Sequence, residues 1–85
     1  MKAVIHNAEV RGKEVKQGQR GNFLIVRYED ETGKPEELRD DDMERESYYR
    51  RGVVMDFTID IRQGRTREGK EYTNIRIIDA REVKS

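Results

Sequence analysis

The sequence predicts a small, mainly β protein: a five-stranded barrel with one short helix between the third and fourth strands. Apolar residues alternate with polar residues over several strand-length segments, and glycine-containing turns separate these segments. A single segment is rich in helix-forming residues, begins with aspartates and stops before a glycine. The chain has 85 residues, 33% of them hydrophobic, so we expect one domain, residues 1–85, with a thin core.

The first half of the chain is expected to contain three strands and two turns. The strands are predicted over residues 2–16, 23–29 and 36–39, and the turns over residues 17–22 and 32–35. Gly12 is expected to mark a bulge or bend in the first strand, because glycine inside a strand weakens regular pairing.

The helix is predicted over residues 40–51, with a length of about two to three turns. Its aspartates suit the N-terminal cap, and Gly52 suits its end. Met43, together with Tyr48 and Tyr49, is expected to give the helix a small apolar face that packs on the barrel.

The clearest strand signal covers residues 53–62, where apolar and polar residues alternate strictly. The residues expected to face the core are Val53, Met55, Phe57, Ile59 and Ile61. A longer basic turn is predicted over residues 63–70, followed by a last strand over residues 71–83. The apolar pattern of that strand slips between Ile77 and Ile78, where a bulge restores the register.

Alternation also assigns the faces of the second and fifth strands. The inward-facing set is expected to be Leu24, Val26, Tyr28, Ile75 and Ile77. The outward-facing set is expected to be Phe23, Ile25, Arg27, Tyr72, Asn74 and Arg76. Five strands with a helix between the third and fourth is the element order of the OB-fold, a partly open Greek-key barrel, and this is the fold that we predict.

Two segments of the chain repeat one pattern. Residues 14–30 and 60–79 each contain an acidic–apolar pair, a basic residue, Gln-Gly and a basic turn with a second glycine. Each continues with an aromatic residue, an apolar run, an arginine and an aspartate. The pattern predicts two β-hairpins with cationic turns. These turns fall on the loops that join strands one to two and four to five, with which OB-folds commonly bind oligonucleotides and oligosaccharides.

The segments Gly21–Lys34 and Asp60–Asn74 resemble the small single-stranded DNA-binding proteins of the OB-fold class that are found in bacteria, plasmids and phages. The resemblance implies a non-enzymatic protein that coats or guards exposed single strands during replication or transfer. The sequence closes on Arg81–Ser85 without the long acidic tail of many bacterial members. We therefore do not expect partners to be recruited through such a tail.

Non-specific binding of a single strand requires cations for the phosphates and aromatic rings for the bases. The candidate cations in or beside the two turns are Lys16, Arg20, Arg62, Arg65, Arg67 and Lys70. Phe23 and Tyr72 occupy equivalent positions in the repeated pattern and are the candidate stacking residues; Arg27 and Arg76 are equivalent in the same way and complete the set. Two alternatives stay open: strand aromatics often serve packing, and cations at hairpin turns often serve solubility.

Charge is unevenly distributed, although the net charge is zero. Residues 29–46 contain ten acidic and three basic residues, whereas the rest of the chain contains fifteen basic and eight acidic ones. We expect the acidic block to form a solvated helix face, with docking against the basic loops of a neighbouring subunit as an alternative. Asp40–Asp42 lacks the spacing and glycine of a calcium loop, so we expect no metal there.

Other functional classes find little support in the sequence. The chain has no cysteine and a single histidine, His6, so we expect no disulfide, metal centre or other cofactor. No catalytic triad or phosphate-binding loop can be identified, so we expect no enzyme. There is no apolar run of about 18 residues and no signal-peptide core, so we expect a cytosolic protein without a membrane partner.

The expected partner is single-stranded nucleic acid, with DNA favoured over RNA, although stacking and phosphate contacts serve both. The alternative is an OB-like protein–protein module, such as a small-subunit adaptor. A thin core and a free strand edge are also compatible with a homodimer.

Overall fold

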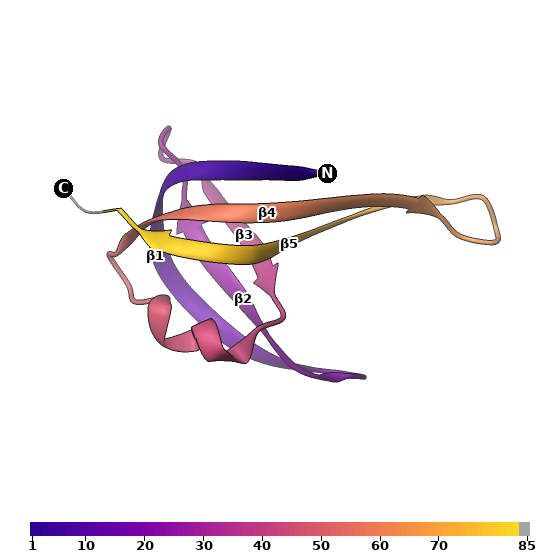
Figure 1. Ribbon diagram of the computed structural model, residues 1–85, viewed down its shortest axis with the longest axis horizontal. Helices are drawn as coiled ribbons and strands as arrows, with labels where there is room; N and C mark the ends of the chain where they lie inside the picture. The colour runs from indigo at the N-terminus through magenta and orange to yellow at the C-terminus, as the bar shows by residue number, and fades with distance from the viewer. Residues whose placement is uncertain (84–85) are drawn as a thin grey trace.

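The computed structural model describes residues 1–83, which form five strands and one short helix (Figure 1). The elements are β1 (Lys2–Gly18), β2 (Gly21–Glu29), β3 (Pro35–Asp40), the 3-10 helix η1 (Met43–Tyr48), β4 (Val54–Arg65) and β5 (Glu71–Glu82). The predicted order of elements is confirmed. Of the closing segment Arg81–Ser85, the last two residues lie outside the described part of the chain.

The strands form a closed barrel in the order β1-β2-β3-β5-β4, in which β4 also pairs with β1. This is an OB-like arrangement, and the predicted fold class is confirmed. All neighbouring strands are antiparallel except β3 and β5, which are parallel and share the single residue pair Arg39–Arg76. The contact between β3 and β5, called the seam below, therefore has the fewest paired residues of any two neighbouring strands in the barrel.

The core lies inside the barrel; its buried residues come from β1, β2, β4, β5 and Tyr49, and the partly buried Leu38 of β3 packs against them. Its buried apolar residues are Ala8, Val10, Leu24, Val26, Tyr28, Tyr49, Met55, Phe57, Ile59, Ile77 and Ala80. Phe57 lies at the centre, with the rings of Tyr28 and Tyr49 edge-on to it at centroid distances of 5.3 Å and 6.0 Å. The inward faces predicted for β2 and β4 are confirmed, with Val53, just before β4, and Ile61, within it, partly buried against the core.

Two predicted bulges are confirmed and a third irregularity was not predicted. In β5, Ile77 is paired with Ile59 and Asp79 with Thr58, so that Ile78 is the extra residue. In β1, pairing with β2 shifts just before Gly12. The irregularity that the sequence did not reveal is centred on Asn7, whose φ of 56° is left-handed and whose backbone N–H donates to Asp56.

The helix is shorter than predicted and is a 3-10 helix, so the predicted range 40–51 is wrong at both ends. Asp40 instead ends β3, where it is buried, and the first turn is capped by Asp42, whose side chain accepts from the N–H of Glu44. Tyr49 leaves the helix so that its ring enters the core, whereas Tyr48 is 49% exposed. Of the predicted apolar face, Tyr49 lies in the core and the partly buried Met43 packs against it, whereas Tyr48 does not.

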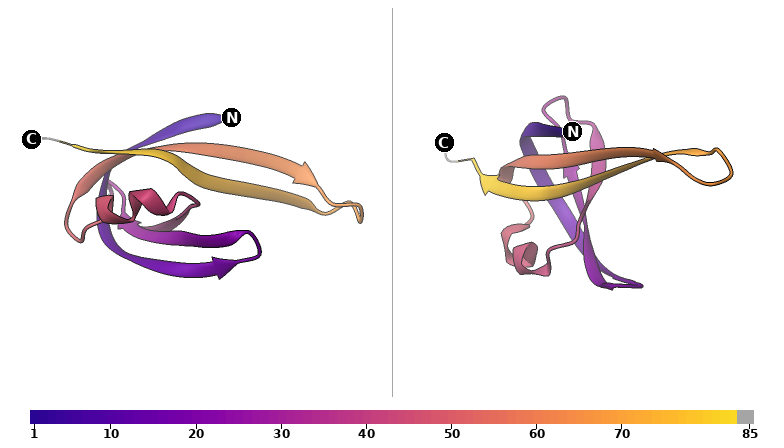
Figure 2. Two further views of the ribbon diagram at one scale, coloured as in Figure 1. Left: turned by 60° about the horizontal axis from the view of Figure 1, so that its bottom comes forward. Right: turned by 45° about the vertical axis from the view of Figure 1, so that its right-hand side comes forward.

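Both hairpins extend beyond the barrel and project toward the same side (Figures 1 and 2). The β1–β2 ladder continues to Gly18–Gly21, and the β4–β5 ladder continues to Arg65–Glu71, so both turns are shorter than predicted. Backbone pairing includes Gly18 in the first hairpin and continues past Gly64 in the second, although the sequence pattern predicted that both glycines belong to the turns. Ile75 lies on the inward-facing side of β5 but is 40% exposed, because it lies at the base of the projecting ribbon.

No helix in the described part of the chain is both long and apolar enough to span a membrane.

Candidate nucleic-acid interface

The repeated Gln-Gly has a structural counterpart in both hairpins: its glycine lies under the aromatic residue of the opposite strand. In the first hairpin, a Cβ at position 18 would lie 3.2 Å from Cε1 of Phe23. In the second, Gly64 is directly paired with Tyr72, and a Cβ there would lie 2.5 Å from the ring carbon Cζ. Each glycine thus leaves room for a ring to lie across the ribbon. The repeated pattern encodes two aromatic surfaces on the projecting hairpins.

Phe23 lies in a hollow between the first turn and the seam of β3 and β5. The hollow has a volume of about 470 Å³ and is lined by Gly18, Gln19, Arg20, Gly21, Asn22, Phe23, Arg39, Asp41 and Arg76. The guanidinium carbon of Arg39 lies 3.9 Å from the centroid of the Phe23 ring, a cation–π contact. The guanidinium of Arg39 thus covers the Phe23 ring with a flat, charged group, which is a suitable surface for stacking of a planar ligand.

Arg39 and Arg76 meet at the seam, where Asp41 bridges them. Arg39 Nε donates to Oδ1 of Asp41 at 2.6 Å, and Arg76 Nη1 donates to Oδ2 at 2.9 Å. Partial burial by itself raises the pKa of Asp41, but the bonds and charges of the two arginines outweigh it and lower the pKa below the usual value. A second hollow of about 220 Å³ continues from this trio to Asn74 and Ile75 on β5.

Tyr72 lies on the β4–β5 ribbon and is 45% exposed. It lines a hollow of about 290 Å³ together with Gln63, Gly64, Arg65, Glu71 and Thr73. Since Tyr72, Asn74 and Arg76 alternate along β5, they share its outer face, as predicted. The first two hollows share Arg39, Asp41 and Arg76 at the seam, and the third lies farther along β5 around Tyr72.

Ion pairing divides the basic residues into two groups. Most of them contact a carboxylate on the barrel surface. Within residues 1–83, the basic side chains that form no ion pair are Lys2, Lys16, Arg20, Arg51, Arg67 and Lys70. Lys16 and Arg20 belong to the first hairpin, and Arg67 and Lys70 to the second turn. The acidic residues thus neutralise cations over much of the barrel, while the hairpins retain charges that face water.

The structure brings together only part of the predicted residue set. Arg20, Phe23 and Arg76 line one hollow, and Lys16 is paired with Phe23 in the ladder. Arg65 and Tyr72 line the hollow of the second ribbon. The remaining predicted residues are Arg62, Arg67, Lys70 and Arg27.

Arg67 and Lys70 are exposed in the second turn, and Arg62 is held by Asp60 at 2.9 Å. Arg27 faces outward as predicted but lies apart from the two turns. It pairs with Glu14 and shares a hollow with Glu29, Glu36 and Glu37, in acidic surroundings.

Arg39 is the residue that sequence reasoning missed. It contacts both Phe23 and Asp41, and it is the partner of Arg76 in the only residue pair between β3 and β5. The sequence shows that Arg39 and Leu38 lie on opposite faces of β3. The position of Arg39 beside Arg76, however, depends on the pairing of β3 with β5, two strands that are remote along the chain. No local signal could have identified it.

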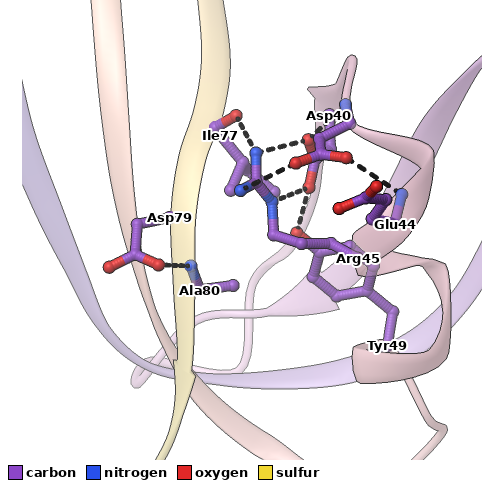
Figure 3. Close-up of polar contacts among 8 residues, drawn as sticks. Asp40, Glu44, Arg45, Tyr49, Ile77, Asp79 and Ala80 are labelled. Carbon is purple, nitrogen blue, oxygen red and sulfur yellow. Dashed lines mark hydrogen bonds and ion pairs between the residues drawn. The ribbon is translucent and has the colours of Figure 1, made fainter.

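A buried polar network supports the seam from behind (Figure 3). Asp40 is fully buried and accepts from Arg45 Nε at 2.7 Å, from Arg45 Nη2 at 3.0 Å and from the hydroxyl of Tyr49. Arg45 also reaches the carbonyl of Ile77 on β5 at 3.5 Å. Burial, followed by the hydrogen bond to Asp40, raises the pKa of Tyr49, so its hydroxyl stays protonated and donates. The network ties η1 to both strands of the seam.

The three consecutive aspartates serve three different purposes. Asp40 belongs to the buried network, Asp41 bridges the two surface arginines, and Asp42 caps η1 and contacts Arg45. The expectation that the acidic block is solvated is therefore wrong for Asp40. Over residues 1–83, no group of three or more potential metal ligands is found.

Neither the protein-family models nor the curated proteins that were compared with the chain match it.

Proposed function

We propose that this protein binds single-stranded nucleic acid, DNA in preference to RNA, without catalysing a reaction. The observation that carries the proposal is the position of four cations without ion pairs, Lys16, Arg20, Arg67 and Lys70, on two hairpins that project from the same side of the barrel. Non-specific binding to a polyanion depends on such cations, because they release the counterions of the phosphates.

The aromatic residues support a ligand whose units also stack. Tyr72 presents an exposed ring on one ribbon, and Phe23 with its covering Arg39 presents a flat cationic surface near the other. Each base stacked on such a surface contributes about 1–3 kcal/mol, independently of its sequence. In this proposal the strand follows the hollows from Tyr72 over Arg76 and Arg39 to the first turn. The protein would coat exposed single strands, in replication or transfer within the cytosol.

The charge balance sets the strength of this binding. The acidic residues neutralise cations over much of the barrel surface, so the hairpins are expected to attract phosphates most strongly. We therefore expect moderate affinity that falls steeply with salt, and weak binding to duplex DNA, whose stacked bases cannot reach Tyr72 or Arg39.

The test is a titration of fluorescent oligo-dT, oligo-rU and a duplex of matched length, each of about 15 nucleotides, near the upper end of the site size for one OB domain. Measurements at about 50 mM and about 200 mM salt separate electrostatic binding from other modes. The proposal predicts salt-sensitive binding of single strands with moderate affinity at low salt, and little binding of the duplex. Tighter binding of oligo-rU would identify RNA as the ligand. Absence of binding at low salt would reject the proposal in favour of the adaptor.

A further inference from the structure

Arg39, Asp41 and Arg76 form an ion cluster in the middle of the candidate interface. Both oxygens of Asp41 are occupied, one by each arginine, at 2.6 Å and 2.9 Å. The side chains are accessible to solvent: Arg39 is 50% exposed, Asp41 39% and Arg76 36%. The cluster also lies between the two hollows of about 470 Å³ and 220 Å³, and all three residues line both.

This arrangement resembles the way in which arginines bind a phosphodiester. A phosphodiester presents two charged, non-bridging oxygens, and Asp41 presents two carboxylate oxygens to the same pair of guanidinium groups. Guanidinium groups bind carboxylates and phosphates with similar geometry, since both anions offer two adjacent oxygens. Asp41 lies on the connection between β3 and η1, outside either element, so its side chain can turn toward water without breaking backbone pairing.

Resting on the proposed function, we infer that Arg39 and Arg76 form a phosphate subsite, in which Asp41 takes the place of a backbone phosphate until a strand binds. The incoming phosphodiester displaces the carboxylate, and the two arginines exchange one anion for another. Asp41 thereby keeps the arginines in position and lowers the affinity for anions that do not also contact the cations of the two hairpins.

Arg39 connects the phosphate subsite to a candidate stacking surface. Its guanidinium lies over Phe23, so a phosphate held there is adjacent to the stacking surface for the neighbouring base. The other arginine, Arg76, lies on the same face of β5 as Tyr72. A phosphate at the seam is therefore between the two candidate stacking sites.

The experiment compares oligo-dT binding by the unaltered protein, Asp41→Asn and Asp41→Glu. Removing the competing charge in Asp41→Asn is expected to tighten binding at low salt by about three- to tenfold. It is also expected to steepen the logarithmic salt dependence by about 0.7, the value for one additional phosphate contact on a single strand. Asp41→Glu retains the charge and is expected to stay within about twofold of the unaltered protein.

The matched control is Glu82→Gln, which changes the net charge equally at the opposite end of β5, where Glu82 pairs with Arg50 at 3.8 Å. Its affinity is expected to change by less than about twofold, because the carboxylate is far from the bound strand. If the unaltered protein binds oligo-dT but Asp41→Asn binds no better, or if Glu82→Gln gains as much, the subsite is rejected while the proposed function stands. If neither the unaltered protein nor Asp41→Asn binds, both are rejected.

A measurement on the unaltered protein covers the case in which Asp41→Asn fails to fold. Nuclear magnetic resonance can follow the Nε–H signal of Arg39 and the carboxylate carbon of Asp41 during titration with oligo-dT. Displacement predicts that both signals move as the strand saturates the protein. If both keep their positions at saturation, the carboxylate has not left the arginines and the inference is wrong.

Discussion

The ring of Tyr72 lies across the backbone of Gly64, its direct partner in the β4–β5 ladder. A side chain at position 64 would occupy the space of the ring, since a Cβ there would lie 2.5 Å from Cζ. The remaining surface of Tyr72 faces solvent, with 45% of the residue exposed. Glycine at position 64 thus leaves room for the Tyr72 ring against the ribbon, and in the proposed function the exposed part of that ring accepts a base.

Replacing Gly64 with valine is expected to displace the Tyr72 ring and to weaken oligo-dT binding about as much as removal of the ring itself, by about 1–3 kcal/mol. The melting temperature should change little, because this part of the ribbon lies beyond the barrel. Fluorescence titration and thermal unfolding measure the two effects. Thr58→Val, farther along β4 and lining none of the three hollows, is the control and should bind normally. Normal binding by Gly64→Val would show that the position of the ring does not matter.

Tyr72→Ala and Phe23→Ala are each expected to weaken binding to single strands by about 1–3 kcal/mol, the contribution of one stacked base. Neither residue belongs to the buried core, so both variants should remain folded. Tyr48→Ala provides a matched control, because Tyr48 is equally exposed, at 49%, but lies at the end of η1. An equal reduction of affinity in all three variants would contradict the assignment of the stacking surface.

The cations without ion pairs are expected to determine the salt dependence. Glutamine at Lys16, Arg20, Arg67 and Lys70 together should reduce the logarithmic salt slope by about 0.7 for each phosphate that is no longer neutralised, or by up to roughly 3. The matched control replaces the same number of ion-paired cations, Arg11, Lys34, Arg50 and Arg81. If the control lowers the slope equally, overall charge rather than the hairpins attracts the strand.

The buried network behind the seam is expected to matter for stability. Asp40→Ala leaves Arg45 without its buried partner and should lower the free energy of unfolding by about 3–5 kcal/mol. Tyr49→Phe removes one hydrogen bond to the same carboxylate and should cost about 1–2 kcal/mol. Denaturant unfolding measures both. Unchanged stability in Asp40→Ala would mean that the network does not hold η1 to the barrel.

Acid should weaken the β2–β3 turn through Asp30. One oxygen of Asp30 accepts from the hydroxyl and N–H of Thr32 and from the N–H of Lys34, at 2.6, 2.9 and 3.0 Å. The hydroxyl bond of Thr32 and then the N–H of Lys34 lower the pKa of Asp30 below its ordinary 3.8 in the folded protein.

Because the pKa of Asp30 is lower in the folded than in the unfolded chain, its contribution to stability is complete above pH 3.8 and is lost as the pH falls through the folded value. Asp30→Asn should therefore lose less stability than the unaltered protein when the pH falls from about 5 to about 3. If the free energy of unfolding of the two proteins falls equally over this pH range, Asp30 does not contribute to the acid sensitivity of folding.

Much of the barrel could be predicted from the sequence, because its strands carry the period-two signal of a sheet with one buried face. The alternation from Val53 to Ile61 identified the core side of β4, and the slip at Ile77–Ile78 identified a bulge. The bend at Asn7 had no comparable signal, since it depends on an acceptor, Asp56, on another strand.

The candidate site could be predicted only where it is local. The Gln-Gly pattern located both hairpins and their aromatic residues, because glycine and its aromatic neighbour belong to the same hairpin. Arg39 and Asp40 depend on contacts between β3, η1 and β5 that form only when the barrel closes. The helix was overestimated for the same reason, since the burial of Asp40 and Tyr49 overrides the local preference for a longer helix.

The most direct test of the central claim is to map oligo-dT binding by the backbone amide signals of isotope-labelled protein. Binding across the hairpins predicts the largest shifts in residues 17–23, at Arg39 and in residues 62–76, with small shifts around Tyr48 and Glu82 at the opposite end of β5. Spectra that do not change at low salt, or shifts concentrated around Tyr48 and Glu82, would contradict the account.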